Sequence, residues 1–242
     1  MAMLRRTLLA TTGLGLLMAS SPAFARVVAG GLPWAPGASA PPRPVAPGGW
    51  QFFTPEEATA VEALVDRLIP PEEEWAGGKD AGCAVFIDRQ LAGPYGRSEG
   101  LYMRPPFAEA HKGQGEQSPL TPAERYRRGL AQLDKYCRDR FAGKGFAELG
   151  DEMKDQILGQ LEKGPIAFEG VSAQGFFSLL LTNTKEGFFA DPVHGGNRNM
   201  VAWRMIGFPG VRYDFRDWVE RHNERYPLPP VSIVGRPEWG RG

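Results

Sequence analysis

The chain has 242 residues, of which 42% are apolar, 23% charged and 11% aromatic, so it can bury the core of one or at most two domains. Lysine plus arginine and aspartate plus glutamate each number 28, and this balance leaves no basic excess for binding nucleic acid. The two cysteines, Cys83 and Cys137, are too few for a disulfide scaffold, a four-cysteine zinc site or the ligands of an iron–sulfur cluster.

The first 25 residues have the three parts of an export signal. Arg5 and Arg6 precede a moderately apolar run over residues 8–18, and Ala23 and Ala25 fit a small-residue cleavage site. The run is too short to span the roughly 30 Å hydrocarbon core of a membrane. The arginine pair and the weakly apolar centre favour the twin-arginine export route over the Sec route, which stays open. We expect cleavage after Ala25 and a periplasmic protein.

Residues 26–49 are expected to be a linker. Within them, residues 29–49 hold six prolines and five glycines, a composition that cannot form a core. An unstructured spacer and a segment that wraps around a partner protein are both consistent with this composition. Trp34 slightly favours wrapping, because a spacer needs no indole ring.

Residues 50–226 carry helical signals. Two capping boxes, at residues 54–57 and 121–124, mark helix starts, because the threonine can accept from the third helical amide while the glutamate reaches back. Helices are predicted over about residues 55–68, 81–91, 122–143, 151–163 and from 173 onward. The run at residues 176–181 is apolar on nearly every side, which is typical of a central buried helix.

Long Gly- and Pro-rich loops separate these helices, above all over residues 93–120. The sequence has no alternating apolar run bounded by hairpin turns. Prolines from residue 227 onward indicate an extended tail over residues 227–242. We therefore expect a mainly α fold, with a compact helical domain over residues 50–226, long Gly/Pro-rich loops, and extended N- and C-terminal segments.

Residues 188–210 hold the candidate functional residues. Those that we expect in a functional or interface loop are Asp191, Pro192, His194, Gly195, Gly196, Asn197, Trp203, Gly207, Phe208, Pro209 and Gly210. Asp191 with Pro192 predicts a tight turn, and the adjacent glycines allow positive φ, so that His194 and Asn197 would be presented from a rigid loop.

This loop has two interpretations. It is either a catalytic or binding loop, in which Asp191 is the nearby base or orienting group for His194, or a structural turn whose polar side chains bond to backbone. The residues alone favour the structural turn, because no partnered serine or cysteine nucleophile accompanies the histidine.

Three stretches together resemble a known family: FFTPEEATAVEALVDRLIPPEE at residues 52–73, AGCAVFIDRQL at residues 81–91 and DPVHGGNRNMVAWRMIGFPG at residues 191–210. With the export signal, they resemble the small (gamma) subunit of membrane-bound periplasmic sugar and polyol dehydrogenases, the gluconate 2-dehydrogenase subunit 3 family. The resemblance covers roughly residues 50–215, and its most specific part is the DPxxGGN…GFPG pattern.

The resemblance implies a non-catalytic subunit that stabilises a GMC-type flavoprotein large subunit and escorts it through export. In this family the large subunit carries FAD, and often an iron–sulfur cluster, and oxidises a sugar, polyol or aldonic acid. A multihaem cytochrome c subunit passes the electrons to quinone. The resemblance implies no cofactor in this chain and attachment to the membrane only through the complex.

The residues agree independently that no cofactor is expected here, since there is no GxGxxG after a predicted strand and no Cys-x-x-Cys-His for haem. The alternative is a free-standing periplasmic enzyme that uses Asp191, His194 and Asn197 on a small polar substrate. An oxidising compartment allows a disulfide between Cys83 and Cys137. Both cysteines also fit the apolar faces of helices as buried free thiols, and the two readings stay open.

Overall fold

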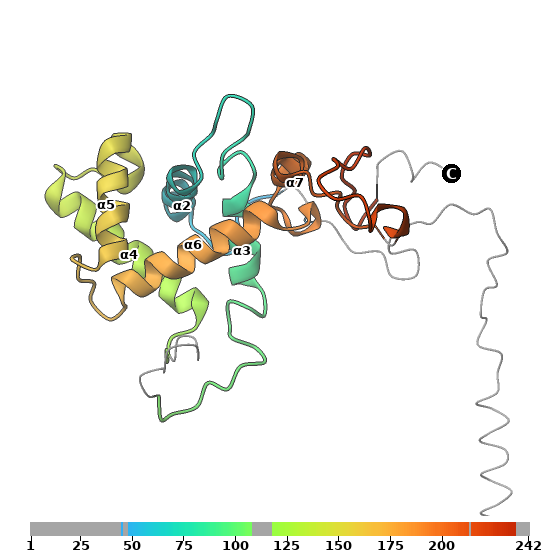
Figure 1. Cartoon of the computed structure of the whole chain (residues 1–242). Helices are drawn as coiled ribbons and strands as arrows, with labels where there is room; N and C mark the ends of the chain where they lie inside the picture. Colours follow the sequence, from blue (N-terminus) through green and yellow to red (C-terminus); the bar gives the residue numbers. More distant parts are fainter. Residues whose placement is uncertain (1–44, 46–47, 108–117, 213, 236–242) are drawn as a thin grey trace, which may run out of the picture. The chain divides into compact units, whose positions relative to one another are not determined.

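The computed structural model describes residues 45, 48–107, 118–212 and 214–235 (Figure 1). The expected export signal, with Arg5, Arg6, Ala23 and Ala25, and most of the expected linker lie outside the described residues. The last seven residues of the expected tail, 236–242, also lie outside them.

The described residues form a mainly helical domain, as the sequence predicts. Its α-helices are α2 (Pro55–Leu68), α3 (Cys83–Ala92), α4 (Pro122–Arg140), α5 (Asp151–Lys163), α6 (Ala173–Phe189) and α7 (Val201–Ile206). Its short 3-10 turns are η1 (Phe146–Glu148), η2 (Pro192–His194), η3 (Arg198–Met200) and η4 (Arg216–Trp218). Isolated β-bridges occur, but this part of the chain has no strand. Among the same residues, no helix combines the length and the apolar character needed to cross a membrane.

The two predicted capping boxes begin α2 and α4. Thr54 Oγ1 accepts from the Glu57 amide at 3.2 Å, and the Glu57 carboxylate accepts from the Thr54 amide at 2.9 Å. Thr121 and Glu124 form the same reciprocal pair. Each box is followed by a proline in the first turn, where its missing N–H is not needed. One turn of sequence is therefore enough to decide where these helices begin.

One predicted helix begins later than the sequence pattern indicates. The pattern predicts a helix from residue 81, but α3 begins at Cys83, because Gly82 adopts φ +83° and cannot be part of the helix. The helix after Ser172 begins as predicted, since Ser172 Oγ accepts from the Gly175 amide at 3.0 Å. This helix, α6, continues to Phe189.

α6 is the central helix of the domain and contacts α2, α3, α4, α5 and α7 (Figure 1). Phe176 and Leu180 on α6 are fully buried. α4 approaches α6 closely, because an added Cβ at Gly129 would lie 2.3 Å from the Phe176 ring. The prediction of a central buried helix is therefore confirmed.

A buried amide on α6 joins this helix to α4 and to the loop after α3. The Asn183 carbonyl oxygen accepts from the Tyr126 hydroxyl at 3.0 Å, and its Nδ2 donates to the Tyr95 hydroxyl at 3.0 Å. Nδ2 also donates to Glu186 at 2.9 Å. Because each polar atom has a partner, burial of the amide is not penalised. The network fixes the first part of the loop that the sequence predicts over residues 93–120.

A buried carboxylate on α3 holds the segment that enters the domain. Asp88 is fully buried and accepts from the amides of Gln51, Phe52 and Phe53, each at 2.9 Å. It also pairs with Arg89, which supplies the opposite charge that a buried carboxylate needs. The start of the helical domain is therefore anchored before α2 begins.

The structure contains no disulfide between Cys83 and Cys137, because both are buried free thiols. Their electrostatic neighbours differ: Arg198 lies near Cys83, whereas Asp134 and Arg138 lie near Cys137. Burial raises the pKa of each thiol to about 12. Of the two readings left open by the sequence, the structure has the buried thiols and not the bridge.

Candidate functional site

The chain turns sharply after α6, as the sequence predicts. Asp191 caps η2, because its carboxylate accepts from the Val193 amide at 3.0 Å, and Pro192 is the first residue of the turn. The His194 amide donates to the Asp191 carbonyl at 3.0 Å. Gly195 then ends the turn with φ +95°, a value that side chains rarely allow.

The two adjacent glycines are needed for different reasons. Of the two, Gly195 has positive φ and Gly196 does not. At Gly196 an added Cβ would lie 2.1 Å from the Gly187 carbonyl oxygen on α6. Gly196 is therefore required because the loop backbone contacts the α6 backbone, which leaves no room for a side chain.

Asn197 is a buried structural residue and is not presented to solvent, so that expectation is corrected. Its Nδ2 donates to the Ala190 carbonyl at 2.9 Å, and its Oδ1 accepts from the Ala202 amide at 2.9 Å. It thereby joins the end of α6 to the start of α7. His194 is exposed, and within the described residues its side chain has no hydrogen bond.

The Asp191 carboxylate also holds the C-terminal segment. It accepts from the Ser232 hydroxyl at 2.8 Å and from the Ile233 amide at 2.7 Å. Together with the Val193 amide, these donors use both carboxylate oxygens. Three of the roughly four acceptor sites of this carboxylate are thus taken by donors other than His194.

The GFPG motif after α7 also contacts the C-terminal segment. Gly207 ends α7 with φ +71°. The Val211 amide donates to the Val231 carbonyl at 2.7 Å, and the Val231 amide donates to the Pro209 carbonyl at 3.3 Å. Gly210 is needed at this crossing, because its Cβ would lie 2.2 Å from the Val231 carbonyl oxygen. The described part of the expected tail is thus attached to the domain.

Trp203 and Phe208 form one wall of a surface groove. Trp203 is buried, its indole N–H donates to the Phe189 carbonyl at 2.9 Å, and its ring meets the Phe208 ring edge-on at 5.2 Å. The opposite wall is made by residues 225–230, and the groove has a volume of about 360 Å³. The sequence did not predict that residues 225–230 form a wall of a groove. Its only indication is the Pro-Leu-Pro-Pro run at residues 227–230, which favours an extended segment.

The other face of the loop contacts the end of the linker. The Val45 amide donates to the Val193 carbonyl at 3.0 Å. A hollow of about 390 Å³ lies between the linker and the loop, lined by Val45, Gly48, Val85, Arg89, Pro192, Gly195 and Arg198. The DPVHGGN loop therefore touches both the incoming and the outgoing parts of the chain.

The arrangement at this site supports assembly better than catalysis. Asp191 and Asn197 are bonded to neighbouring chain segments; of the three candidate residues, His194 alone is exposed and has no side-chain partner in the described part. Within that part, no group of three or more His, Cys, Asp or Glu side chains could hold a metal ion. The exposed features are instead apolar and aromatic side chains beside arginines, which are typical of protein interfaces.

A family model described as Gluconate 2-dehydrogenase subunit 3 matches residues 55–210 of the chain. The match begins at the first residue of α2 and ends at Gly210 of the GFPG motif. No curated protein and no solved structure matches the chain.

Proposed function

Because the chain belongs to the gluconate 2-dehydrogenase subunit 3 family, we propose that it is the non-catalytic small subunit of a periplasmic, membrane-bound dehydrogenase. Membership of this family implies a subunit of a larger dehydrogenase complex. In the proposal, the catalytic partner is a GMC-type flavoprotein that contains FAD and oxidises a sugar, polyol or aldonic acid. A multihaem cytochrome c subunit then passes the electrons to quinone.

One observation carries the non-catalytic assignment. In the DPVHGGN loop, the side chains of Asp191 and Asn197 hold segments of this chain, and Asn197 is fully buried. A free-standing enzyme that used them with His194 would need three groups converging on one open position. Nothing in the site favours that alternative over a structural and interface role.

Co-purification tests the subunit role. The full-length chain, carrying an affinity tag, is purified from solubilised membranes of its native host and, separately, after expression alone. We expect the native preparation to contain a second polypeptide with stoichiometric flavin and dehydrogenase activity toward an artificial electron acceptor. The chain expressed alone should have neither. Stoichiometric flavin or activity in the isolated chain would overturn the proposal.

The escort role rests on the signal at the start of this chain. The double change Arg5→Lys and Arg6→Lys keeps both charges but removes the guanidinium groups that the twin-arginine route reads. We expect both this chain and its flavoprotein partner to remain in the cytoplasm, which cell fractionation measures. If the partner still reaches the periplasm at normal levels, this chain is not its escort.

A further inference from the structure

The groove beside α7 is lined by residue types that often anchor protein interfaces. Its walls include Trp203, Arg204, Phe208, Tyr226 and Leu228. Phe208 is 44% exposed and Leu228 is 52% exposed, although both are large and apolar. Tryptophan, tyrosine and arginine are the residue types enriched among binding hot spots. The composition of the groove therefore fits a protein partner.

Arg204 and Arg225 give the groove a positive charge that no described residue of this chain balances. Both line it and are exposed, and neither has an ion pair or hydrogen bond among the described residues. Among the described residues that line it, none is an aspartate or a glutamate.

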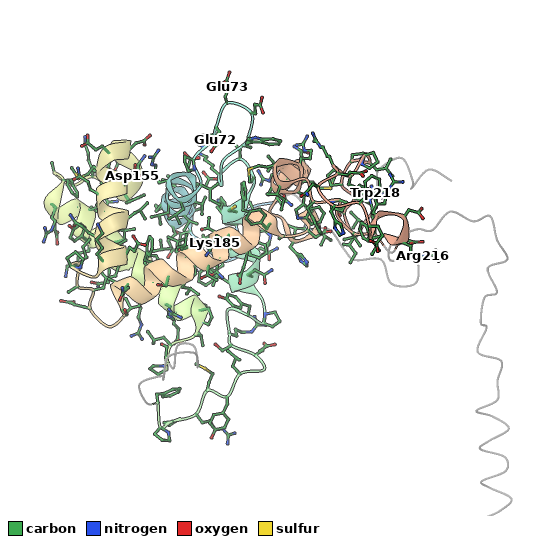
Figure 2. The ribbon with its side chains drawn as sticks, viewed as in Figure 1. Glu72, Glu73, Asp155, Lys185, Arg216 and Trp218 are labelled. Atoms are coloured by element: carbon green, nitrogen blue, oxygen red, sulfur yellow. The ribbon has the colours of Figure 1, made fainter. Side chains whose placement is uncertain are left out.

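Two arginines in the same stretch of sequence do have acidic partners. Arg221 pairs with Glu224 at 3.9 Å and lies over the Trp218 ring. Arg216, labelled with Trp218 in Figure 2, pairs with Asp214 at 2.5 Å. The charge in the groove is thus a local feature and not a general property of this segment.

Both walls of the groove are held in place by internal bonds. Trp203 is fixed to the end of α6 by its bond to Phe189. On the opposite wall, Arg212 donates to the Pro229 carbonyl at 2.6 Å and lies over the Tyr226 ring, 5.0 Å from its centroid. A groove that is already ordered loses little conformational entropy when a partner binds.

We propose that this groove binds an apolar segment of the catalytic subunit, with acidic side chains of that segment paired to Arg204 and Arg225. The proposal rests on the proposed function, and it names the surface and the chemistry of the contact. Apolar side chains of the segment bury Phe208 and Leu228, and its carboxylates supply the charges that the groove lacks. Such a complex is weakened by salt, because the charge pairs lie near the surface.

Charge reversal in the intact complex tests the proposal. The double variant Arg204→Glu and Arg225→Glu is compared with a matched control, Lys135→Glu and Lys185→Glu. Lys135 lies on α4 and Lys185 on α6, both are exposed, and neither has an ion pair in the described part (Figure 2 labels Lys185). After a salt wash, we expect the groove variant to hold at most about one tenth as much catalytic subunit as the control holds. Equal retention by the two variants would overturn the proposal.

Cross-linking gives a readout that leaves both arginines unchanged. The photo-crosslinking residue p-benzoylphenylalanine replaces Leu228 in one preparation of the complex and Lys135 in another. We expect position 228 to cross-link to a peptide of the catalytic subunit that has apolar residues next to Asp or Glu, as identified by mass spectrometry. A cross-link to a second copy of this chain, to the cytochrome or to a basic peptide, or none in an intact complex, would overturn the groove assignment.

The two proposals fail in different ways. If the unchanged chain purifies without any catalytic subunit, the proposed function is wrong, and the groove assignment falls with it. If the unchanged chain forms the complex but the groove variant is retained like its control, only the groove assignment is wrong.

Discussion

The Asp191 carboxylate accepts a hydrogen bond of 2.8 Å from the hydroxyl of Ser232, which lies 41 positions later in the chain. Asp88 has a comparable role where the chain enters the domain, since it accepts from the amides of residues 51–53. In each case an acidic side chain holds a chain segment that enters or leaves the helices. The start of the helical domain and the described part of the tail are therefore anchored at defined points.

Replacing Asp191 with alanine should release the C-terminal segment. Asp191→Ala removes the acceptor for Ser232 and Ile233, and each hydrogen bond contributes about 1 kcal/mol. We expect hydrogen exchange at the Val231 and Ile233 amides to become about tenfold faster or more. Asp217→Ala is the control, because Asp217 is exposed and has no bond among the described residues. Unchanged exchange in Asp191→Ala would show that the segment is held by other contacts.

Two changes in the DPVHGGN loop separate a structural from a catalytic role. Gly195→Val places a β-branched residue at φ +95° with a Cβ 3.2 Å from Val85, which costs on the order of 1 to 3 kcal/mol. We expect it to reduce assembly while turnover per remaining complex stays normal. His194→Gln should be mild, because the imidazole is exposed. Lost turnover in a fully assembled His194→Gln complex, with cofactor content unchanged, would establish a catalytic histidine.

The same substitution should have opposite effects at two helical glycines. Gly129→Ala on α4 forces a Cβ to within 2.3 Å of the Phe176 ring, so overpacking should destabilise the domain by about 1 to 3 kcal/mol. Gly159→Ala on α5 meets nothing within 4 Å and should stabilise it by roughly 0.5 to 1 kcal/mol through helix propensity. Denaturant unfolding of the mature chain measures both. A Gly129→Ala chain as stable as the unchanged one, or more stable, would contradict the close packing of α4 on α6.

Both cysteines should be unreactive in the folded protein. Burial raises the pKa of Cys83 and Cys137 to about 12, so only about one thiol in ten thousand is ionised at pH 8. We expect iodoacetamide to modify neither thiol in the native state and both in denaturant without reductant. Mass spectrometry counts the added groups. Protection that persists in denaturant and disappears with reductant would show a disulfide.

The raised pKa values of the two thiols also determine how the free energy of unfolding changes with pH. The folded state keeps these thiols protonated, whereas in the unfolded state they ionise near pH 8.5. Between that pH and about 12 the unfolded state binds fewer protons, so these thiols lower the free energy of unfolding as pH rises. Replacing both cysteines with alanine should reduce this alkaline slope.

The sequence by itself determined where most helices lie and to which family the chain belongs. Capping boxes such as Thr54 with Glu57 act within one turn, and apolar spacing selects the buried face of each helix. The burial of the run around Phe176 follows from the same spacing. These features are local, so a single stretch of residues contains all the information that they need.

Only the tertiary structure decided how the candidate residues are used. Asn197 is buried because its amide joins two helices, and Gly196 is required because α6 runs beside it. Asp191 meets Ser232, and Arg204 and Arg225 share one groove, because distant segments fold back on each other. No local pattern encodes such contacts, since they depend on which backbones approach once the helices have packed around α6.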